Sequence, residues 1–255
     1  MTAAAFFDLD RTLLRRSSSL ALAGSFRERG LIGRGHLARA ALWQLLFVAR
    51  GASGDAVRRA AEDGMAVLRG VTVEELQALV AGAMEPVLKP LVFAEPLALV
   101  RRHRERGEPV YVVSAALQEI VDALVAELGL DGGIGSTCGV EDGVYTGRVL
   151  RGCHGLEKAE ALRELAAEGG IDLAASTAYS DSHTDLPFLE AVGHPVAVNP
   201  DRELRRVAAA RGWPVLEFSE RLYPRAVPRV PAAAYAIPFA VGAAAALRKR
   251  NRRAA

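Results

Sequence analysis

An apolar run that ends in two carboxylates constrains this chain more than any other stretch. The segment Phe6-Phe7-Asp8-Leu9-Asp10-Arg11-Thr12 places two aspartates directly after apolar residues. On an extended backbone, side chains two residues apart point the same way. Because a buried charge is costly without a cation or a donor, Asp8 and Asp10 predict a ligand site at the carboxyl end of a buried strand. The plainer interpretation is a strand followed by an acidic turn.

Helices and strands alternate along the second half of the chain. After Pro96 the pattern switches between helical spacing and short apolar runs bounded by Gly and Pro. This alternation is typical of a parallel sheet with helices on both faces, so we expect an α/β chain with a Rossmann-like sheet. The expected strands cover residues 4–9, 109–113, 177–180, 195–198 and 214–218, with a hairpin at 136–140 and 144–149. The expected helices cover residues 96–106, 116–128, 156–168, 184–191 and 201–211.

Residues 15–90 are expected to form an all-helical insert after the first strand. Stretches punctuated by glycine predict four helices with no strand between them, at 18–29, 36–49, 55–68 and 72–84. The expected domains are therefore a core of residues 1–14 and 91–220, a helical domain of 15–90 and a tail of 221–255. The apolar stretch 37–49 is either the core of the insert itself or a wall that meets an apolar substrate or a membrane.

Composition and charge narrow the class of protein. The chain has 255 residues, of which 51% are hydrophobic and 24% charged, which indicates a globular protein. Residues 221–255 hold eight Arg or Lys and no acid, so residues 1–220 hold 24 basic and 30 acidic residues. Without a folded basic face, we expect no nucleic-acid partner. No secretory signal precedes Asp8, so we expect a cytoplasmic protein with Cys138 and Cys153 reduced.

The tail combines an uncharged segment with a basic cluster. Residues 230–247 carry no charge, which reaches the length of a short membrane helix, and residues 248–253 are almost all basic. Two prolines, many alanines and the basic cluster beyond the segment argue against a span. We therefore expect a flexible or loosely packed tail. Weak contact with an anionic membrane surface, which would make the protein peripheral there, remains an alternative.

Three further places combine polar side chains with the end of a strand or the start of a helix. Ser114 closes an expected strand just before a helix, whose free N–H groups suit a phosphate, or it merely caps that helix. Lys158 lies one turn into a helix, either as a solvated surface charge or as a cation at the edge of the sheet. Asp181 and Asp185 follow another strand, which suits Mg²⁺ or an acidic loop that caps the next helix.

Taken in order, these places resemble the motifs of the haloacid dehalogenase (HAD) superfamily of phosphohydrolases. The matching segments are Asp8-Leu9-Asp10-Arg11-Thr12, Ser114, Lys158, and Asp181 through Asp185. The run 96–128 and the hairpin with its Asp142-Gly143 turn look like the phosphoserine-phosphatase-like subclass (HAD-IB). That subclass carries a helical-bundle cap directly after the first motif, where this chain has residues 15–90. The resemblance covers about residues 4–218.

The resemblance implies a phosphomonoester hydrolase. Asp8 would be the nucleophile that forms an aspartyl-phosphate, and Asp10 would be the general acid and base. Thr12 would orient these groups at the substrate phosphate. Ser114 and Lys158 would bind the oxygens of the transferring phosphoryl group.

The same resemblance implies Mg²⁺ as the cofactor. The ion would lie among the Asp8 side chain, the Asp10 carbonyl and Asp181, with Asp185 in support. Because an anionic nucleophile must approach an anionic phosphate, such a site needs Mg²⁺ and a lysine to offset the repulsion. The dehalogenases of the family lack an acid at the position of Asp10, which argues for phosphate chemistry.

The sequence departs from the phosphoserine phosphatases at several positions. Ser17 stands where they carry a glutamate that holds the substrate amine, Ala115 where they usually carry glycine, and Thr184 where they carry asparagine. Arg11 replaces a common glycine. We therefore expect a small phosphorylated metabolite or a lipid-derived phosphate, rather than phosphoserine, as the substrate. The alternatives are a phosphotransferase of the same fold and a catalytically idle, membrane-associated binding protein.

Overall fold

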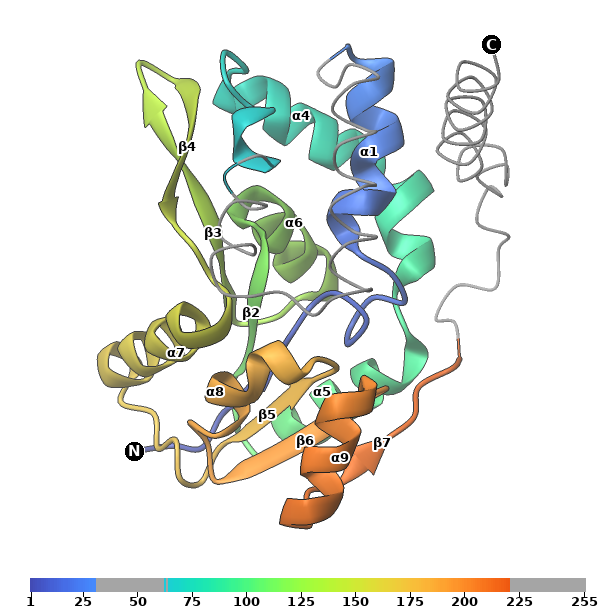
Figure 1. The fold of residues 1–255 in the computed structure, drawn as a ribbon, viewed down its shortest axis with the longest axis vertical. Coiled ribbons are helices and arrows are strands. Elements are labelled where there is room, and N and C mark those ends of the chain that lie inside the picture. Colours follow the sequence, from blue (N-terminus) through green and yellow to red (C-terminus); the bar gives the residue numbers. More distant parts are fainter. Residues whose placement is uncertain (31–61, 63, 221–255) are drawn as a thin grey trace, which may run out of the picture.

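One twisted sheet runs through the computed structural model, which describes residues 1–30, 62 and 64–220. In this part of the chain seven strands follow the order β4-β3-β2-β1-β5-β6-β7 (Figure 1). Neighbouring strands are parallel except for β3 and β4, which form an antiparallel hairpin. The strands are β1 Ala5–Phe7, β2 Val110–Leu117, β3 Gly132–Glu141, β4 Val144–Arg151, β5 Thr177–Ser180, β6 His194–Val198 and β7 Val215–Leu216.

The helices connect these strands as expected for a parallel sheet. The α-helices are α1 Ser18–Glu28, α4 Val73–Ala83, α5 Ala94–Glu105, α6 Gln118–Leu128, α7 Gly155–Gly169, α8 Leu186–Leu189 and α9 Arg202–Arg211. A π-helical turn at Met84–Leu88 and a 3-10 turn at Lys89–Leu91 follow α4, and a 3-10 turn at His183–Asp185 precedes α8. Thr72 caps α4 through a reciprocal capping box with Glu75.

Two apolar cores lie on opposite faces of the sheet. On β1, Ala5 and Phe7 belong to the core that includes α5, α6 and the described helices of the insert. Phe6, between them, belongs to the core formed with α7, α8 and α9. All three side chains are fully buried, and their alternation follows the two-residue period of a strand. The fold is thus the predicted α/β sheet with helices on both faces.

The hairpin β3–β4 holds the segment before α4 against the edge of the sheet. Asp142 and Gly143 connect the strands with φ of 49° and 77°, as a two-residue type I′ turn requires. The backbone N–H of Tyr145 donates to the Val71 carbonyl at 2.9 Å, and the N–H of Gly70 donates to the Tyr145 carbonyl at 3.0 Å. The chain entering α4 is therefore paired with β4.

The described elements agree with most predicted ranges, with one correction that concerns the site. Ser114 was expected to stand directly before a helix, but β2 continues to Leu117 and α6 begins only at Gln118. Leu117 pairs with Ser136 of β3, after an irregularity in the ladder beyond Val113. The longer strand therefore results from a distant pairing that local pattern does not reveal.

Several expectations concern residues outside the described part. The predicted helix at 36–49 lies there entirely and the one at 55–68 mostly, as does the whole tail of 221–255 with its segment 230–247. Within the described ranges, no helix is both long and apolar enough to cross a membrane. Cys138 and Cys153 are both buried and free.

Gly193 offers a test of the close packing between the segments that lead into β5 and β6. A Cβ atom at this position would lie 1.7 Å from the Ala174 carbonyl oxygen, so Gly193→Ala must displace backbone. We expect it to lower the free energy of unfolding by more than about 2 kcal/mol, as overpacking commonly does. Urea denaturation measures this change.

Gly24→Ala serves as the matched control. This glycine lies within α1, and an added Cβ would meet nothing within 4 Å. Alanine should stabilise the helix by roughly 0.5–1 kcal/mol. Equal stability of the Gly193→Ala variant and the unchanged protein would contradict the packing described here.

Candidate active site

Three neighbouring strands bring the predicted site residues together. Phe7 of β1 pairs with Val112 of β2 and with Tyr179 of β5. One residue further along β1 comes Asp8, whose backbone N–H donates to the Tyr179 carbonyl at 2.9 Å. Two residues further along the neighbours come Ser114 and Asp181. Strand register therefore places three of the four predicted motifs at one edge of the sheet.

Lys158 supplies the fourth motif from α7. Its Nζ lies 2.6 Å from Asp8 Oδ1 and 2.5 Å from Asp185 Oδ2. The lysine is only 1% exposed, and both carboxylates are also buried. The surface interpretation of this residue is therefore wrong, since a buried cation here bridges two motifs separated by most of the chain. The Phe188 ring, 4.7 Å from Nζ, covers the ammonium group.

Asp185 is held by a second donor. Ser180, the last residue of β5, donates its hydroxyl to Asp185 Oδ2 at 2.6 Å. With Lys158 on the same oxygen, Asp185 fixes the lysine that contacts Asp8. Asp185 thus supports the site through Lys158. Ser180 was not among the predicted site residues. Its position at the end of an expected strand, next to Asp181, could have indicated it.

Asp181 meets a different cation. The Nε atom of Arg11 lies 3.2 Å from Asp181 Oδ2. Asp181 is 5% exposed, and this oxygen is buried without a hydrogen-bond partner in the described structure. The arginine therefore contacts it as a charge, without the geometry of a hydrogen bond. In the sequence, Arg11 was notable only as a replacement for a common glycine, and its contact with Asp181 was not predicted.

Asp10 is bound to the start of α1. The backbone N–H of Ser18, the first residue of the helix, donates to Asp10 Oδ1 at 2.8 Å. A helix amino terminus favours a carboxylate through its free N–H groups and its dipole. Ser17 caps the same helix by accepting the Leu20 N–H. Sequence patterns did not reveal this contact of Ser18 with a predicted site residue, because it depends on how the chain turns after Asp10.

Two buried hydroxyls complete the donor set. Thr12 is fully buried, and its Oγ1 has no hydrogen-bond partner in the described part of the chain. Ser114, 2% exposed, accepts the Ala116 N–H at 3.2 Å, which leaves its own hydroxyl hydrogen available to donate. Unpartnered buried hydroxyls are costly and are usual at sites that bind a polar ligand.

Burial and mutual repulsion shift the acidities of these carboxylates. Burial raises the pKa of Asp181 to about 8, and the nearby Asp8 acts in the same direction. Burial also raises the pKa of Asp8 to about 7, against the opposing effect of Lys158. The pKa of Asp10 is raised by burial as well, against the hydrogen bond from Ser18. The pKa of Lys158 is raised, because Asp185 and Asp8 together outweigh the effect of burial.

The donors fit a hard divalent cation that takes part of its shell from backbone. Among the described residues, no group of three or more His, Cys, Asp or Glu side chains could by itself hold a metal ion. Asp8 and Asp181 offer two buried carboxylates that repel one another, and one oxygen of Asp181 lacks a hydrogen bond. Magnesium accepts one or two carboxylates with carbonyl or water oxygens. These two side chains therefore suit it, with backbone carbonyl or water oxygens as further ligands.

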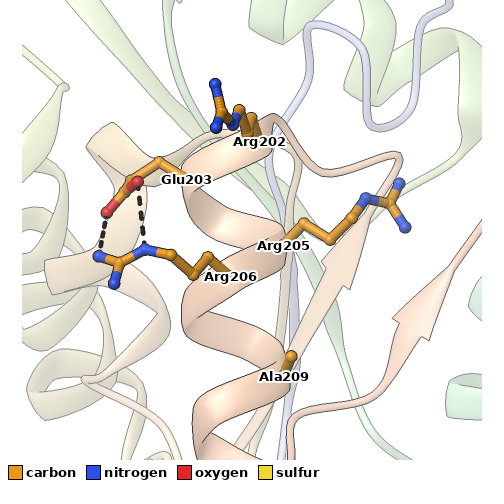
Figure 2. Close-up of a pocket in the computed structure, with 5 residues that line it drawn as sticks. All are labelled: Arg202, Glu203, Arg205, Arg206 and Ala209. Atoms are coloured by element: carbon orange, nitrogen blue, oxygen red, sulfur yellow. Dashed lines mark hydrogen bonds and ion pairs between the residues drawn. The ribbon is translucent and has the colours of Figure 1, made fainter.

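A hollow on the surface of α9 lacks the buried carboxylates and hydroxyls of this site. Five residues of α9 line a hollow of about 690 Å³, namely Arg202, Glu203, Arg205, Arg206 and Ala209 (Figure 2). Arg206 pairs with Glu203 and Arg205 with Glu217. Because these charges are exposed and largely paired, the hollow does not compete with the buried cluster as a catalytic site.

Curated proteins similar to this chain include phosphatases. A "probable phosphatase" of Mycobacterium tuberculosis is 43% identical over 95% of this chain and 85% of its own length. A Streptomyces azureus protein named for inhibition of morphological differentiation is 42% identical over 95% of this chain and 90% of its own. A phosphoserine phosphatase of M. tuberculosis is 36% identical over 98% of this chain and 82% of its own.

A family profile and solved structures also match this chain. The profile of haloacid dehalogenase-like hydrolases matches residues 5–190. A Bordetella pertussis protein of unknown function has a TM-score of 0.75 at 30% identity, over 85% of this chain and 99% of its own. A phosphoserine phosphatase solved as a phospho-aspartyl intermediate analogue has a TM-score of 0.59 at 19% identity, over 87% of this chain and 95% of its own. At this low identity the likeness supports the fold alone and carries no conclusion about the substrate.

The raised acidities predict how stability depends on pH. In the unfolded chain Asp8 and Asp181 titrate near 3.8, whereas in the folded protein they retain protons up to about pH 7 and 8. Their contribution to stability is therefore fully present below the unfolded pKa and is lost as the pH rises through the folded values. We expect the protein in EDTA to be less stable to urea at pH 8.5 than at pH 6.

The variant Asp181→Asn isolates this effect. Asparagine does not titrate, so the loss of stability between pH 6 and pH 8.5 should become smaller. Added Mg²⁺ should stabilise the unchanged protein more at pH 8.5 than at pH 6, because metal binding requires deprotonated carboxylates. The same pH dependence in the variant and the unchanged protein would exclude Asp181 as a source.

Proposed function

This chain belongs to the haloacid dehalogenase-like hydrolase family and is a phosphatase-like hydrolase, and from this premise we propose that it hydrolyses phosphomonoesters through Asp8. The observation that carries the proposal is the buried contact of Lys158 with Asp8 and Asp185, at 2.6 and 2.5 Å. A buried ammonium group beside a carboxylate nucleophile can also bind an approaching phosphate. Charge repulsion would otherwise oppose that approach.

The proposed reaction has two displacement steps. A carboxylate oxygen of Asp8 attacks phosphorus, and the bond from phosphorus to the substrate oxygen breaks while Asp10 protonates that oxygen. Water then attacks the aspartyl-phosphate and gives its proton to Asp10, and the bond from phosphorus to Asp8 breaks to release phosphate. The raised pKa of Asp10 suits a residue that must hold a proton before it donates it.

The remaining side chains bind and orient. Lys158, Ser114 and Thr12 donate to the oxygens of the phosphoryl group. Asp8 and Asp181, with the Asp10 carbonyl, would hold Mg²⁺, and Asp185 keeps Lys158 in place. When bound, the ion supplies positive charge that offsets the repulsion between the phosphate and the carboxylates.

We further propose that residues 15–90 form a cap over a core of residues 1–14 and 91–220. In the described part of this segment, α1 begins beside Asp10 and α4 contacts α6. Such a layer next to a reaction centre can exclude water until the substrate is bound. A cytoplasmic location, with weak membrane contact through residues 221–255, belongs to the same proposal.

The substrate is proposed to be a small phosphorylated molecule other than phosphoserine. Ser17 occupies the position of the amine-binding glutamate, and here its hydroxyl caps α1. A neutral hydroxyl cannot offset the charge of a substrate ammonium group. In a panel of phosphorylated metabolites and lipid-derived phosphates, we expect another compound to exceed phosphoserine in kcat/KM by at least about tenfold, which corresponds to about 1.4 kcal/mol of transition-state binding. Phosphoserine as the best substrate would contradict this.

Replacement of the nucleophile is the central test. Asp8→Asn should abolish Mg²⁺-dependent hydrolysis of p-nitrophenyl phosphate, because the amide cannot form the aspartyl-phosphate. Removal of preorganised charge alone typically costs about 10²–10³ in rate, and removal of the nucleophile should cost more. Circular dichroism should show an unchanged fold. Normal turnover by the variant would overturn the proposal.

Product analysis separates the alternatives. Release of inorganic phosphate that is unaffected by added alcohols indicates a hydrolase, whereas phosphorylated alcohol as the main product indicates a phosphotransferase. An idle binding protein would show neither product with any member of the panel. The intact set of Asp8, Asp10, Lys158 and Asp181 favours an active enzyme.

A further inference from the structure

Arg11 adopts a backbone conformation that its side chain disfavours. Its φ is 65°, in the left-handed region that glycine enters without strain. Two other described non-glycine residues have positive φ, Asp142 and Asn199, and these residue types tolerate that region better than arginine does. Strain of this kind persists where the surroundings impose it and is concentrated at functional sites. An arginine at this position therefore requires an explanation beyond the turn itself.

The side chain of Arg11 reaches a proposed metal ligand. Its Nε lies 3.2 Å from Asp181 Oδ2, and the arginine side chain is 58% exposed while that of Asp181 is 6% exposed. The same oxygen has no hydrogen-bond partner among the described residues. The guanidinium group thus approaches a buried carboxylate from the solvent side and contacts it by charge alone. Such a contact is readily exchanged, since exposed ion pairs contribute little to stability.

We propose that Arg11 is a built-in counter-cation of the metal site, which pairs with ionised Asp181 in the metal-free protein and is displaced when Mg²⁺ binds. This inference rests on the proposed function, because it takes Asp181 as a ligand of the ion. Two cations cannot share one oxygen at close range without strong repulsion. Arg11 therefore lowers the affinity for Mg²⁺, and the metal-free protein avoids leaving ionised Asp181 buried without a cation.

The role differs from that of Lys158. Lys158 is fully buried on Asp8 and Asp185 through two hydrogen bonds, so it stays in place with or without the metal. Arg11 has a long, mostly exposed side chain, and within the described ranges its one ion pair is this loose contact, so it can leave. Asp181 thus has an exchangeable cation partner, and Asp8 has a permanent one.

Two variants of Arg11 separate charge from backbone strain. Arg11→Gly and Arg11→Ala both remove the guanidinium group, and only glycine relieves the strained φ. Isothermal titration calorimetry with MgCl₂ should give a Kd about fivefold lower for both, the ratio that corresponds to an exposed ion pair. In EDTA, the Tm of Arg11→Gly should exceed that of Arg11→Ala by about 2–4 °C.

Arg101→Gln is the matched control for net charge. Arg101 is exposed on α5, and its replacement also removes one positive charge, so its Kd for Mg²⁺ should equal that of the unchanged protein. An unchanged or weaker affinity in both Arg11 variants, while the unchanged protein binds Mg²⁺ and hydrolyses aryl phosphate, would overturn this inference alone. If the unchanged protein neither bound Mg²⁺ nor hydrolysed the substrate, the proposed function would fail and the inference with it.

Discussion

The fold of the site depends on one buried cation. Lys158 brings α7 against the carboxyl ends of β1 and β5 by contacting Asp8 and Asp185. A single charge in an apolar interior would be strongly unfavourable, and so would either carboxylate alone. Together they are tolerable, but only in this arrangement. Removal of any one of the three groups would leave an uncompensated charge in the interior, which is strongly destabilising.

Most strands and the positions of the motifs were predictable because they follow from local pattern. Apolar runs bounded by turn residues identified β1, β5 and β6, and the Asp142-Gly143 turn identified the hairpin. The convergence of Asp8 and Asp181 followed from the rule that parallel strands end at the same edge. Periodicity, turn chemistry and one topological rule were sufficient for these features, whereas Lys158 was expected at the site only from the family resemblance.

The remaining features depend on contacts between distant segments. The continuation of β2 past Ser114 requires Leu117 to pair with Ser136. The contact of Ser18 with Asp10 and the reach of Arg11 to Asp181 both depend on the turn after β1. No periodicity in the sequence encodes them, since each is a single contact fixed by the tertiary structure. Residues 31–61 and 221–255 lie outside the described part, so the predictions made for them stay predictions.

The hydrogen bond between Ser18 and Asp10 connects the proposed general acid directly to the proposed cap of residues 15–90. If α1 shifts during turnover, Asp10 shifts with it. The carboxylate proposed to protonate the departing group is fastened to the first peptide of α1. Any rotation of α1 would therefore change the direction of the Asp10 carboxyl group. Substrate entry, the position of α1 and the orientation of the Asp10 carboxyl group would then be coupled through one hydrogen bond, donated by the backbone N–H of Ser18.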